Sequence, residues 1–224
     1  MKIVKKALIF DFDGVIADSI SVKTDAFREI YSKYGEKVEA KVVRHHLKNG
    51  GMSRYKKIDY YQNNYLGQKL NQDQLISYCD KFSKLVINKV INAPLVSGIE
   101  SFLNENYKLY KLFISTGTPE DEIKKIAFEK NLNKFFINIY GSPDNKKDHI
   151  EKIFKDYKIL YSNMIFIGDS ITDYNAAQKM NIKFILRRHK DNISYFKNYS
   201  GPNINDFKSH KFLNLLTSMN SNEK

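Results

Sequence analysis

The sequence predicts an α/β fold, a Rossmann-like parallel sheet with a second, all-α domain inserted near its start. Short apolar runs of strand length recur along the chain, and most of them end in Gly, Asp, Ser or Thr. Segments with helical periodicity separate these runs, the order typical of parallel strands joined by right-handed crossovers. About 90 residues lie between the first two runs, far more than one crossover requires.

Five apolar runs are the expected strands of the sheet. The first, Ala7–Phe10, is followed at once by Asp11, Asp13 and Gly14. The other four runs are residues 109–114, 135–140, 164–167 and 182–186, and the first three of these lead into the polar stretches 115–119, 141–147 and 168–173. Ligands gather at the carboxyl ends of parallel strands, so the polar stretches should meet at one edge of the sheet.

The segments between the strands have the period of core-facing helices. Residues 147–158 carry the clearest apolar stripe, at positions i, i+3, i+4 and i+7: Ile150, Ile153, Phe154 and Tyr157. Shorter stripes occur in residues 123–127 and 176–180. We expect these stripes to pack against the sheet rather than to contact a cofactor.

The insert between the first two strands is predicted to be a separate helical domain. Residues 18–34 and 71–91 have helical periodicity, and the insert lacks the alternating pattern of strands. The stretch 93–98, which contains Pro94 and Gly98, is typical of a hinge or boundary. The predicted division is therefore a core of residues 1–17 and 95–215, a helical domain of residues 18–94, and a polar, disordered tail of residues 216–224.

Asp11 and Asp13 are the strongest indication of chemistry. Two carboxylates at i and i+2 on a tight turn repel each other, so a cation or a proton should accompany them. A divalent metal would satisfy one carboxylate, and a proton held for catalysis would suit the other. A solvated turn is the alternative, because Asp and Gly dominate turns. A calcium loop is not indicated, because its later acidic positions are missing.

Together, the four motifs across residues 7–186 resemble those of the haloacid dehalogenase superfamily of hydrolases, most of whose members are magnesium-dependent phosphatases. The resemblance implies that the core is of that family's type and that the insert is its helical cap. It also implies that Asp11 is the nucleophile, which forms an aspartyl-phosphate and so splits one difficult step into two easier ones. Asp13 would be the general acid and then the base that activates water.

The same resemblance assigns the groups that hold the phosphoryl group. The Ser115 hydroxyl would bind it, with the backbone N–H groups around Thr116 and Gly117. Lys146 would neutralise the nucleophile and the phosphoryl oxygens. Its spacing to His149 favours Lys146 over Lys147, which is the alternative.

The resemblance also implies a Mg²⁺ site. Its ligands would be the side chains of Asp11 and Asp169 and the backbone carbonyl of Asp13, with Asp173 supporting the metal shell. Magnesium prefers oxygen ligands and keeps several waters, so few carboxylates are needed.

The stretch 48–55 of the cap contains Gly50, Gly51, Ser53 and Arg54. It resembles the substrate-specificity loop of capped members, including the sugar-phosphate mutase branch, and Arg54 would bind an anionic group of the substrate. The alternative is a plain turn between helices with a surface arginine.

Other reactive side chains have simpler explanations. Lys23 is expected to be solvated, His45 and His46 point apart on a helix, and Cys79 is expected to pack inertly.

Composition is compatible with a cytoplasmic enzyme. The formal charge of +12 would attract anionic substrates, but no nucleic-acid-binding module is visible. One cysteine excludes an internal disulfide. The start, Met1–Lys6, is basic, but the apolar run that follows stops at Asp11 and is too short for a signal peptide. No stretch predicts a membrane span. Whether the protein is a monomer or a dimer is left open.

Three functions remain. The first is a capped, Mg²⁺-dependent phosphatase of a small phosphorylated metabolite, such as a sugar phosphate or a phosphoglycolate-like phosphomonoester. The second is a phosphosugar mutase of the β-phosphoglucomutase type, which Gly51, Ser53 and Arg54 favour and Lys23 disfavours. The third, from another class, is a non-catalytic basic binding protein.

Overall fold

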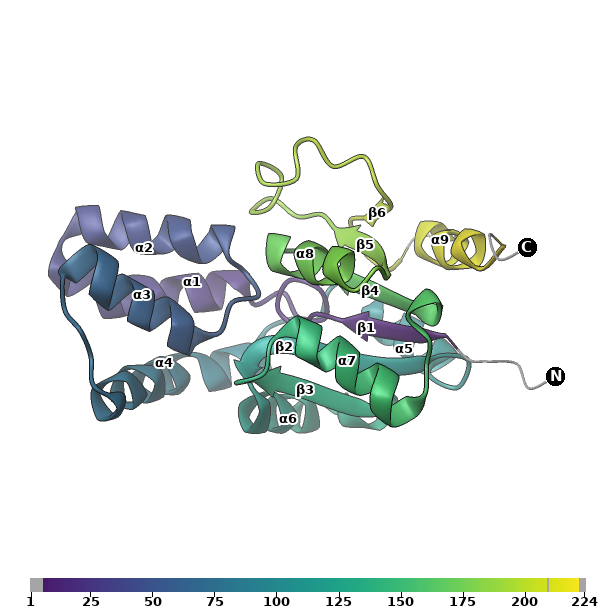
Figure 1. Cartoon of the computed structure of the whole chain (residues 1–224), viewed down its shortest axis with the longest axis horizontal. Coiled ribbons are helices and arrows are strands. Elements are labelled where there is room, and N and C mark those ends of the chain that lie inside the picture. The colour runs from purple at the N-terminus through teal and green to yellow at the C-terminus, as the bar shows by residue number, and fades with distance from the viewer. Residues whose placement is uncertain (1–5, 209, 222–224) are drawn as a thin grey trace.

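A computed structural model describes residues 6–208 and 210–221 of the chain. Within this part, the strands form one parallel sheet in the order β3-β2-β1-β4-β5-β6 (Figure 1). The strands are β1 (Ala7–Phe10), β2 (Lys111–Pro119), β3 (Asn138–Ser142), β4 (Met164–Gly168), β5 (Lys183–Arg187) and β6 (Asn203–Ile204). The predicted Rossmann-like sheet is confirmed, and β1 lies at its centre.

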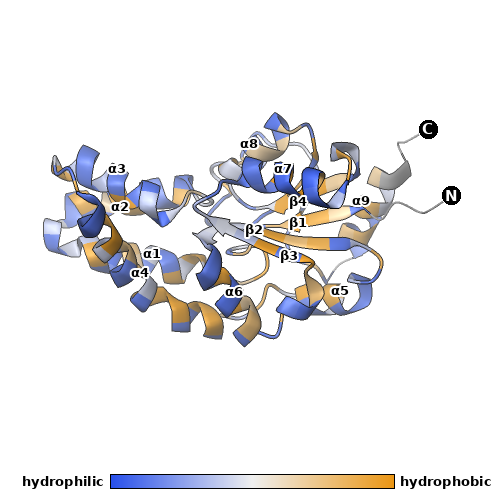
Figure 2. Cartoon of the chain, turned by 60° about the horizontal axis from the view of Figure 1, so that its bottom comes forward, coloured by the Kyte–Doolittle hydropathy of each residue, from blue (hydrophilic) through white to orange (hydrophobic). Residues whose placement is uncertain are grey.

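Helices cover both faces of the sheet. The helices α5 (Ile99–Asn106), α6 (Glu120–Glu129) and α9 (His210–Ser221) share a core with Leu8 and Phe10 of β1. On the other face, α7 (Lys146–Tyr157) and α8 (Ile171–Lys179) share a core with Ala7 and Ile9. A strand buried on both faces reads as a continuous apolar run, which is why β1 has no alternating pattern (Figure 2).

Four helices of the insert form a separate layer beside the sheet's carboxyl edge (Figure 1). They are α1 (Ile20–Tyr31), α2 (Glu36–Lys48), α3 (Arg54–Leu66) and α4 (Gln72–Asn92), and a short 3₁₀ turn, Ser32–Tyr34, follows α1. Aromatic rings join them, with 4.4 Å between the ring centroids of Phe27 and Phe82 and 5.4 Å between those of Tyr31 and Tyr61. Contacts at these distances add about 0.5–1.5 kcal/mol each beyond simple burial.

Two linkers run side by side between the core and this helical cap. The Asp18 N–H donates to the Pro94 carbonyl at 2.9 Å, and the Val96 N–H donates to the Ile16 carbonyl at 2.9 Å. The chain therefore leaves and re-enters the core at one place. The division into domains at residues 17/18 and 94/95 stays a prediction, and these paired linkers are compatible with it.

Two element boundaries differ from the expectation. The strand predicted at 135–140 begins only at Asn138, because Asn133–Phe135 forms a 3₁₀ turn. Strand β2 continues past Ile114 to Pro119, so Ser115–Thr118 belong to the strand rather than to a loop.

The prediction of a disordered tail from residue 216 is wrong as far as residue 221. Helix α9 includes Leu216, which is fully buried, one turn after the buried Phe212. The Phe212 ring packs against Phe102 of α5 with 4.8 Å between centroids. This i, i+4 apolar pair outweighs the polar composition of the segment. Residues 222–224, like the basic start at 1–5, lie outside the described part of the chain.

Candidate active site

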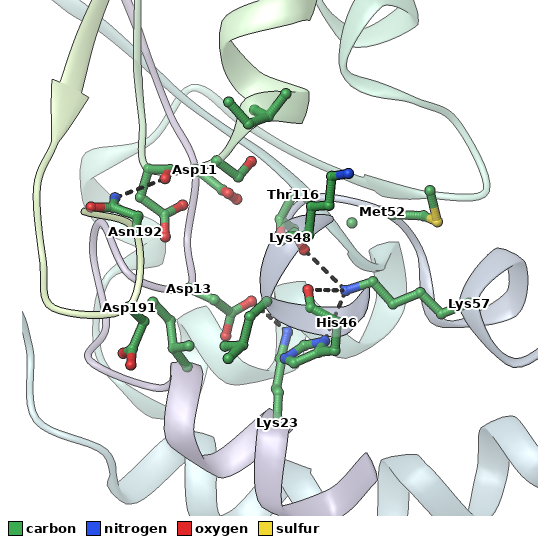
Figure 3. A pocket seen from close by; sticks show the side chains of 18 of the residues that line it. Asp11, Asp13, Lys23, His46, Lys48, Met52, Lys57, Thr116, Asp191 and Asn192 are labelled. Atoms are coloured by element: carbon green, nitrogen blue, oxygen red, sulfur yellow. Dashed lines mark hydrogen bonds and ion pairs between the residues drawn. The ribbon is translucent and has the colours of Figure 1, made fainter. Parts of the chain in front are cut away.

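A pocket opens between the carboxyl edge of the sheet and the cap (Figure 3). The core contributes Asp11, Asp13, Thr116, Gly117 and Asp169, and the cap contributes Lys23, Gly51, Arg54 and Lys57. The sheet edge is thus acidic, whereas the cap side is basic. The predicted meeting of the polar stretches at this edge is what the structure shows.

Asp11 lies at the end of β1 and is only 4% exposed. Its Oδ1 accepts a hydrogen bond of 2.7 Å from the Phe12 N–H, and its Oδ2 lies 2.8 Å from the Lys146 Nζ. Burial, with repulsion from Asp173, raises the pKa of Asp11 well above its usual range, although Lys146 opposes this shift. The positive charge of Lys146 alone is therefore not enough to balance the buried carboxylates around Asp11.

Lys146, at the start of α7, is also bonded to Asp173. Burial disfavours its charge, but attraction to Asp11 and Asp173 outweighs this and raises the pKa of Lys146 above its usual value. Lys147 points the other way and pairs with Glu151 at the surface. The geometry therefore places Lys146, and not Lys147, beside the predicted nucleophile.

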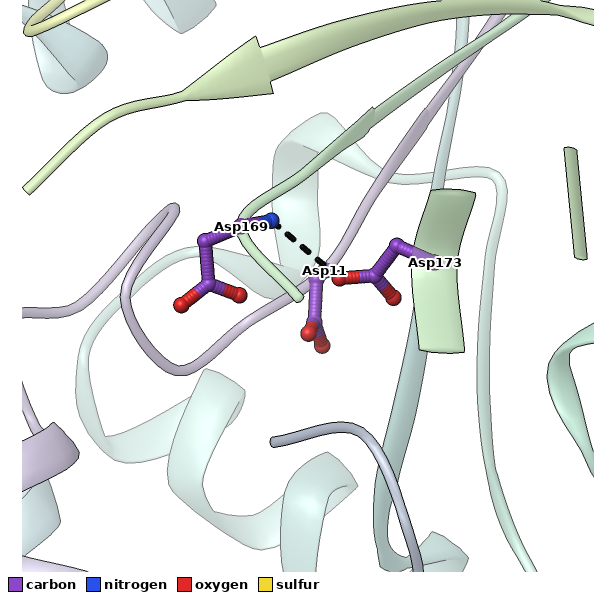
Figure 4. A group of neighbouring side chains, drawn as sticks. All are labelled: Asp11, Asp169 and Asp173. Carbon is purple, nitrogen blue, oxygen red and sulfur yellow. Dashed lines mark hydrogen bonds between the residues drawn. The ribbon is translucent and has the colours of Figure 1, made fainter. Parts of the chain in front are cut away.

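Asp11, Asp169 and Asp173 form a buried acidic cluster whose carboxylate oxygens lie within 4.8 Å of one another (Figure 4). Burial, with repulsion from Asp173, also raises the pKa of Asp169 well above its usual range. Hard oxygen donors that repel each other at this distance suit a divalent cation. The residues present therefore fit a divalent metal, whereas the Asp13 side chain points elsewhere.

Asp173 also shapes the loop that carries Asp169. Its Oδ2 accepts hydrogen bonds from the Asp169 N–H at 3.1 Å, the Ser170 N–H at 3.0 Å and the Ser170 hydroxyl at 2.7 Å. The bond from the Ser170 N–H is one half of the capping box of α8, and the other half is the bond from the Asp173 N–H to the Ser170 hydroxyl oxygen at 3.4 Å. Together these bonds orient the loop. Asp173 thus lies behind the loop of Asp169, the place at which the resemblance predicts a residue that supports the metal shell.

His189 is a site residue that the sequence analysis did not single out. Its Nε2 lies 2.8 Å from Asp169 Oδ2, while its Nδ1 accepts from the Asp191 N–H at 3.3 Å. Burial, helped by the nearby Arg187, lowers the pKa of His189 to about 4. The ring is therefore neutral and donates its Nε2 proton to Asp169, as partners of metal-binding carboxylates commonly do.

Asp13 is held by the cap. Lys23 of α1 bonds to Asp13 Oδ2 and, at 2.6 Å, to the Thr118 hydroxyl, while the Ser19 hydroxyl donates to Asp13 Oδ1 at 2.6 Å. Burial opposes ionisation, but Lys23 and Ser19 outweigh it and lower the pKa of Asp13. The expectation that Lys23 is solvated is wrong, because its charge is needed beside this carboxylate.

Ser115 does not reach the pocket, although we predicted that it binds the phosphoryl group. It is fully buried, and its hydroxyl lies 2.8 Å from His149 Nδ1. His149 Nε2 donates to the Gly141 carbonyl at 3.1 Å, so Nδ1 must accept the Ser115 proton. Neighbouring residues of a strand point to opposite faces, and Thr116 lines the pocket instead.

Arg54 reaches the pocket but is already paired. Its guanidinium contacts both carboxylate oxygens of Glu122 on α6, and Ser83 of α4 bonds to both side chains. Arg54 is 4% exposed and stacks over the Phe82 ring, with 4.7 Å from Cζ to the centroid. Arg54 therefore joins the cap to the core in this structure, and its charge is neutralised.

The glycine loop of the cap fits directly onto the core. The Gly51 N–H donates to the Thr172 hydroxyl at 3.0 Å. A Cβ on Gly51 would lie 2.7 Å from Lys146 Cε, so a side chain there would displace Lys146.

The predictions for three other cap residues agree with the structure. His45 and His46 point apart, as expected of neighbours on a helix. Cys79 is buried, and burial raises the pKa of its thiol to about 12.

A family model described as haloacid dehalogenase-like hydrolase matches residues 8–187. The chain belongs to this family. A phosphoglycolate phosphatase of Psychrobacter arcticus is 25% identical over 207 residues, which cover 87% of this chain and 86% of that protein. The predictions of an enzyme and of a haloacid dehalogenase-like hydrolase are confirmed, and these matches support its assignment as a phosphoric monoester hydrolase.

Two solved structures have the same fold. A β-phosphoglucomutase of Clostridium difficile matches with a TM-score of 0.78 and 18% identity, covering 97% of this chain and 98% of that chain. A haloacid dehalogenase-like hydrolase of Streptococcus pneumoniae matches with a TM-score of 0.70 and 24% identity, covering 96% and 98%. At these identities the likeness concerns the fold alone.

Proposed function

We propose that this protein is a Mg²⁺-dependent phosphatase that hydrolyses a small phosphorylated metabolite through an aspartyl-phosphate on Asp11. The observation that carries the proposal is the placement of Asp11 beside Lys146 and within a buried acidic cluster, at a pocket between the core and the cap. The phosphoglycolate phosphatase relative supports a phosphomonoester as the substrate.

In the first step, an Asp11 oxygen forms a bond to phosphorus while the bond from phosphorus to the leaving oxygen breaks. Lys146 lies 2.8 Å from Asp11 and would balance the charge of the phosphoryl oxygens. Thr116, together with the backbone around Gly117, replaces Ser115 as the proposed contact to the phosphoryl group, because it lines the pocket. The cap excludes water from this step.

In the second step, a water oxygen forms a bond to the phosphorus of the aspartyl-phosphate, its proton passes to Asp13, and the bond from phosphorus to the Asp11 oxygen breaks, which releases phosphate and regenerates the Asp11 carboxylate. Asp13 is the proposed base, and Lys23 favours the ionised form that Asp13 has once its proton has passed to the leaving oxygen. In the first step the proton for the leaving oxygen would come from Asp13 as well. Lys23 and Ser19 orient the carboxylate for both steps.

Asp11 and Asp169, with the Asp13 carbonyl, are the proposed Mg²⁺ ligands, and Asp173 and His189 support them. When bound, Mg²⁺ supplies positive charge that aligns the phosphoryl group with Asp11 and allows it to approach the acidic cluster.

The mutase alternative loses part of its support. It depended on Arg54 as a ligand for an anionic group, and that guanidinium is paired with Glu122. The non-catalytic alternative is disfavoured because the predicted nucleophile, lysine and acidic residues lie within contact of one another.

No helix in the described residues is long and apolar enough to span a membrane. We further propose that the enzyme is cytoplasmic, that it is a monomer or a dimer, and that it has no nucleic-acid partner.

Phosphate release from a panel of phosphomonoesters, measured with and without Mg²⁺, tests the proposal. Wild type should release phosphate only with Mg²⁺, and Asp11→Asn should reduce the rate by at least about 10⁴-fold. Asp18→Asn is a matched control, because Asp18 is exposed at the end of the same segment. Equal rates for Asp11→Asn and wild type would refute the proposal.

A further inference from the structure

The pocket is lined by three cap cations that have little exposure, and they differ in their partners. Lys23 is paired with Asp13, and Arg54 is paired with Glu122. Lys57 of α3 is 2% exposed, and among the described residues no carboxylate lies within ion-pair distance of it. The first two charges are therefore balanced by a carboxylate in contact, whereas Lys57 has only the more distant carboxylates of Asp13, Asp11 and Asp169.

The contacts of Lys57 Nζ are all neutral. It lies 2.9 Å from His46 Nδ1 and 3.4 Å from the carbonyl oxygens of His46 and Gly50 (Figure 3). Burial, with the nearby Lys57 charge, lowers the pKa of His46 well below its usual range, so the ring is a neutral acceptor. These contacts orient the ammonium group and leave its charge without a counter-ion.

A buried charge without a partner is costly, and proteins rarely retain one without a use for it. The cost is visible in Lys57 itself: burial, with repulsion from Lys23, outweighs the attraction to the more distant carboxylates of Asp13, Asp11 and Asp169 and lowers the pKa of Lys57 to about 7. An anion in the pocket would restore the charged form. The surroundings of Lys57 therefore suit the binding of a negatively charged ligand.

The core side already supplies the positive charge that the reacting phosphoryl group needs. It has Lys146 and the proposed metal, and these lie at the acidic edge of the sheet. Lys57 comes from the cap and lines the same pocket as Asp11 and Asp13. An anion at Lys57 would thus belong to another part of the same substrate molecule.

We propose that Lys57, with His46 and the Gly50 carbonyl as its frame, is a subsite for a second anionic group of the substrate, a carboxylate or a second phosphate. The proposal rests on the proposed function. It moves anion recognition in the cap from Arg54, which the sequence suggested, to Lys57. The substrate class is therefore a phosphomonoester that is also acidic at its other end.

Steady-state kinetics with three substrates tests the subsite and distinguishes its two possible anions. They are 2-phosphoglycolate, which has a carboxylate, a pentulose bisphosphate, which has a second phosphate, and p-nitrophenyl phosphate, which has neither. Lys57→Met should raise KM for at least one acidic substrate by about 10- to 100-fold, the loss expected for a hydrogen bond between charged groups. It should change KM for p-nitrophenyl phosphate by less than about threefold.

Lys56→Met is the matched control, because Lys56 is the neighbouring residue on α3 and is exposed. It should leave all three KM values unchanged. Equal changes for all substrates in Lys57→Met, or no change for either acidic substrate, would overturn the subsite.

Thermal melting separates a binding role from a structural one. Removal of an unpaired buried charge should leave the melting temperature of ligand-free Lys57→Met equal to or above that of wild type. If Lys57 were a structural residue, Lys57→Met and Lys57→Gln would both melt at lower temperatures and lose affinity for all three substrates alike.

Binding to the Asp11→Asn protein separates this proposal from the proposed reaction. Calorimetric titration with 2-phosphoglycolate and the bisphosphate should show tighter binding when Lys57 is present than in the double variant Asp11→Asn, Lys57→Met. Lys57-dependent binding without turnover in wild type would refute the phosphatase and retain the subsite. Turnover in wild type, with binding that is independent of Lys57, would refute the subsite and retain the phosphatase.

Discussion

Lys146 and Lys57 are both almost completely buried at the same site, yet their surroundings are opposite. Lys146, on the core side, lies between Asp11 and Asp173, and the two carboxylates raise its pKa. Lys57, on the cap side, contacts only neutral acceptors, and burial lowers its pKa to about 7. The core side balances its charges internally, whereas the cap side leaves a charge for the ligand to balance.

This difference separates two kinds of buried charge. A paired charge holds the site together, so its removal should damage both folding and catalysis. An unpaired charge is held ready for binding, so its removal should damage binding alone. The two lysines offer this comparison on the two sides of one site, the core side and the cap side.

Loss of Lys146 should have the largest effect. Lys146→Met leaves Asp11 and Asp173 buried without their cation, which should lower the free energy of unfolding by about 3–5 kcal/mol. The rate of phosphate release should fall by about 10²- to 10³-fold. Urea unfolding without divalent metal and steady-state kinetics would measure the two effects. Lys147→Met, at an exposed position, is the control, and equal effects of the two variants would contradict the account.

The Arg54–Glu122 pair should behave like Lys146, because it is also a buried, paired charge. Arg54→Gln and Glu122→Gln should each lower the free energy of unfolding by about 2–4 kcal/mol, and the double variant should lose little more than either one. A double-mutant cycle by urea unfolding measures this coupling. Additive losses would show that the pair does not join the cap to the core. Increased KM in Arg54→Gln alone would instead make Arg54 a substrate ligand.

His189 extends the comparison, because it supports the acidic cluster as a neutral donor. His189→Ala removes the hydrogen bond to Asp169 and should raise the Mg²⁺ concentration needed for half-maximal activity by about 10- to 100-fold. His210→Ala, in the exposed first turn of α9, should not change it. An unchanged Mg²⁺ requirement in His189→Ala would exclude this supporting role.

The pH dependence of the free energy of unfolding tests directly whether Lys57 is an unpaired buried charge. Its pKa is about 7 in the folded protein and near 10.5 when unfolded, so between these values the unfolded chain binds more protons. The contribution of Lys57 to the free energy of unfolding therefore rises with pH between these two pKa values. Between pH 7 and pH 9, ligand-free wild type should gain about 2 kcal/mol of unfolding free energy relative to Lys57→Met, measured in urea. A parallel pH dependence of both proteins would mean that Lys57 is not an unpaired buried charge.

Much of the core was predictable because its signals are local. The apolar run Ala7–Phe10, followed by Asp11 and Asp13, indicates a strand and an acidic edge in seven residues. Lys146 could be preferred over Lys147 because it shares a helix face with His149, and both side chains are buried.

Other features depend on information that the local pattern does not contain. Strand β2 is buried on both faces, so polarity does not tell whether Ser115 or Thr116 faces the pocket. The Arg54–Glu122 pair joins residues 68 positions apart. Lys57 resembles any lysine of an exposed helix until tertiary packing buries it.

Detection of the phosphorylated enzyme tests the central claim most directly. Wild type would be mixed with a good substrate and Mg²⁺, quenched in acid within one turnover, digested and analysed by mass spectrometry. The account predicts one phosphoryl group on the peptide that contains Asp11, formed and lost at rates that match phosphate release, and none in Asp11→Asn. Phosphate release without phosphorylated Asp11, or with the phosphoryl group on another residue, would contradict it.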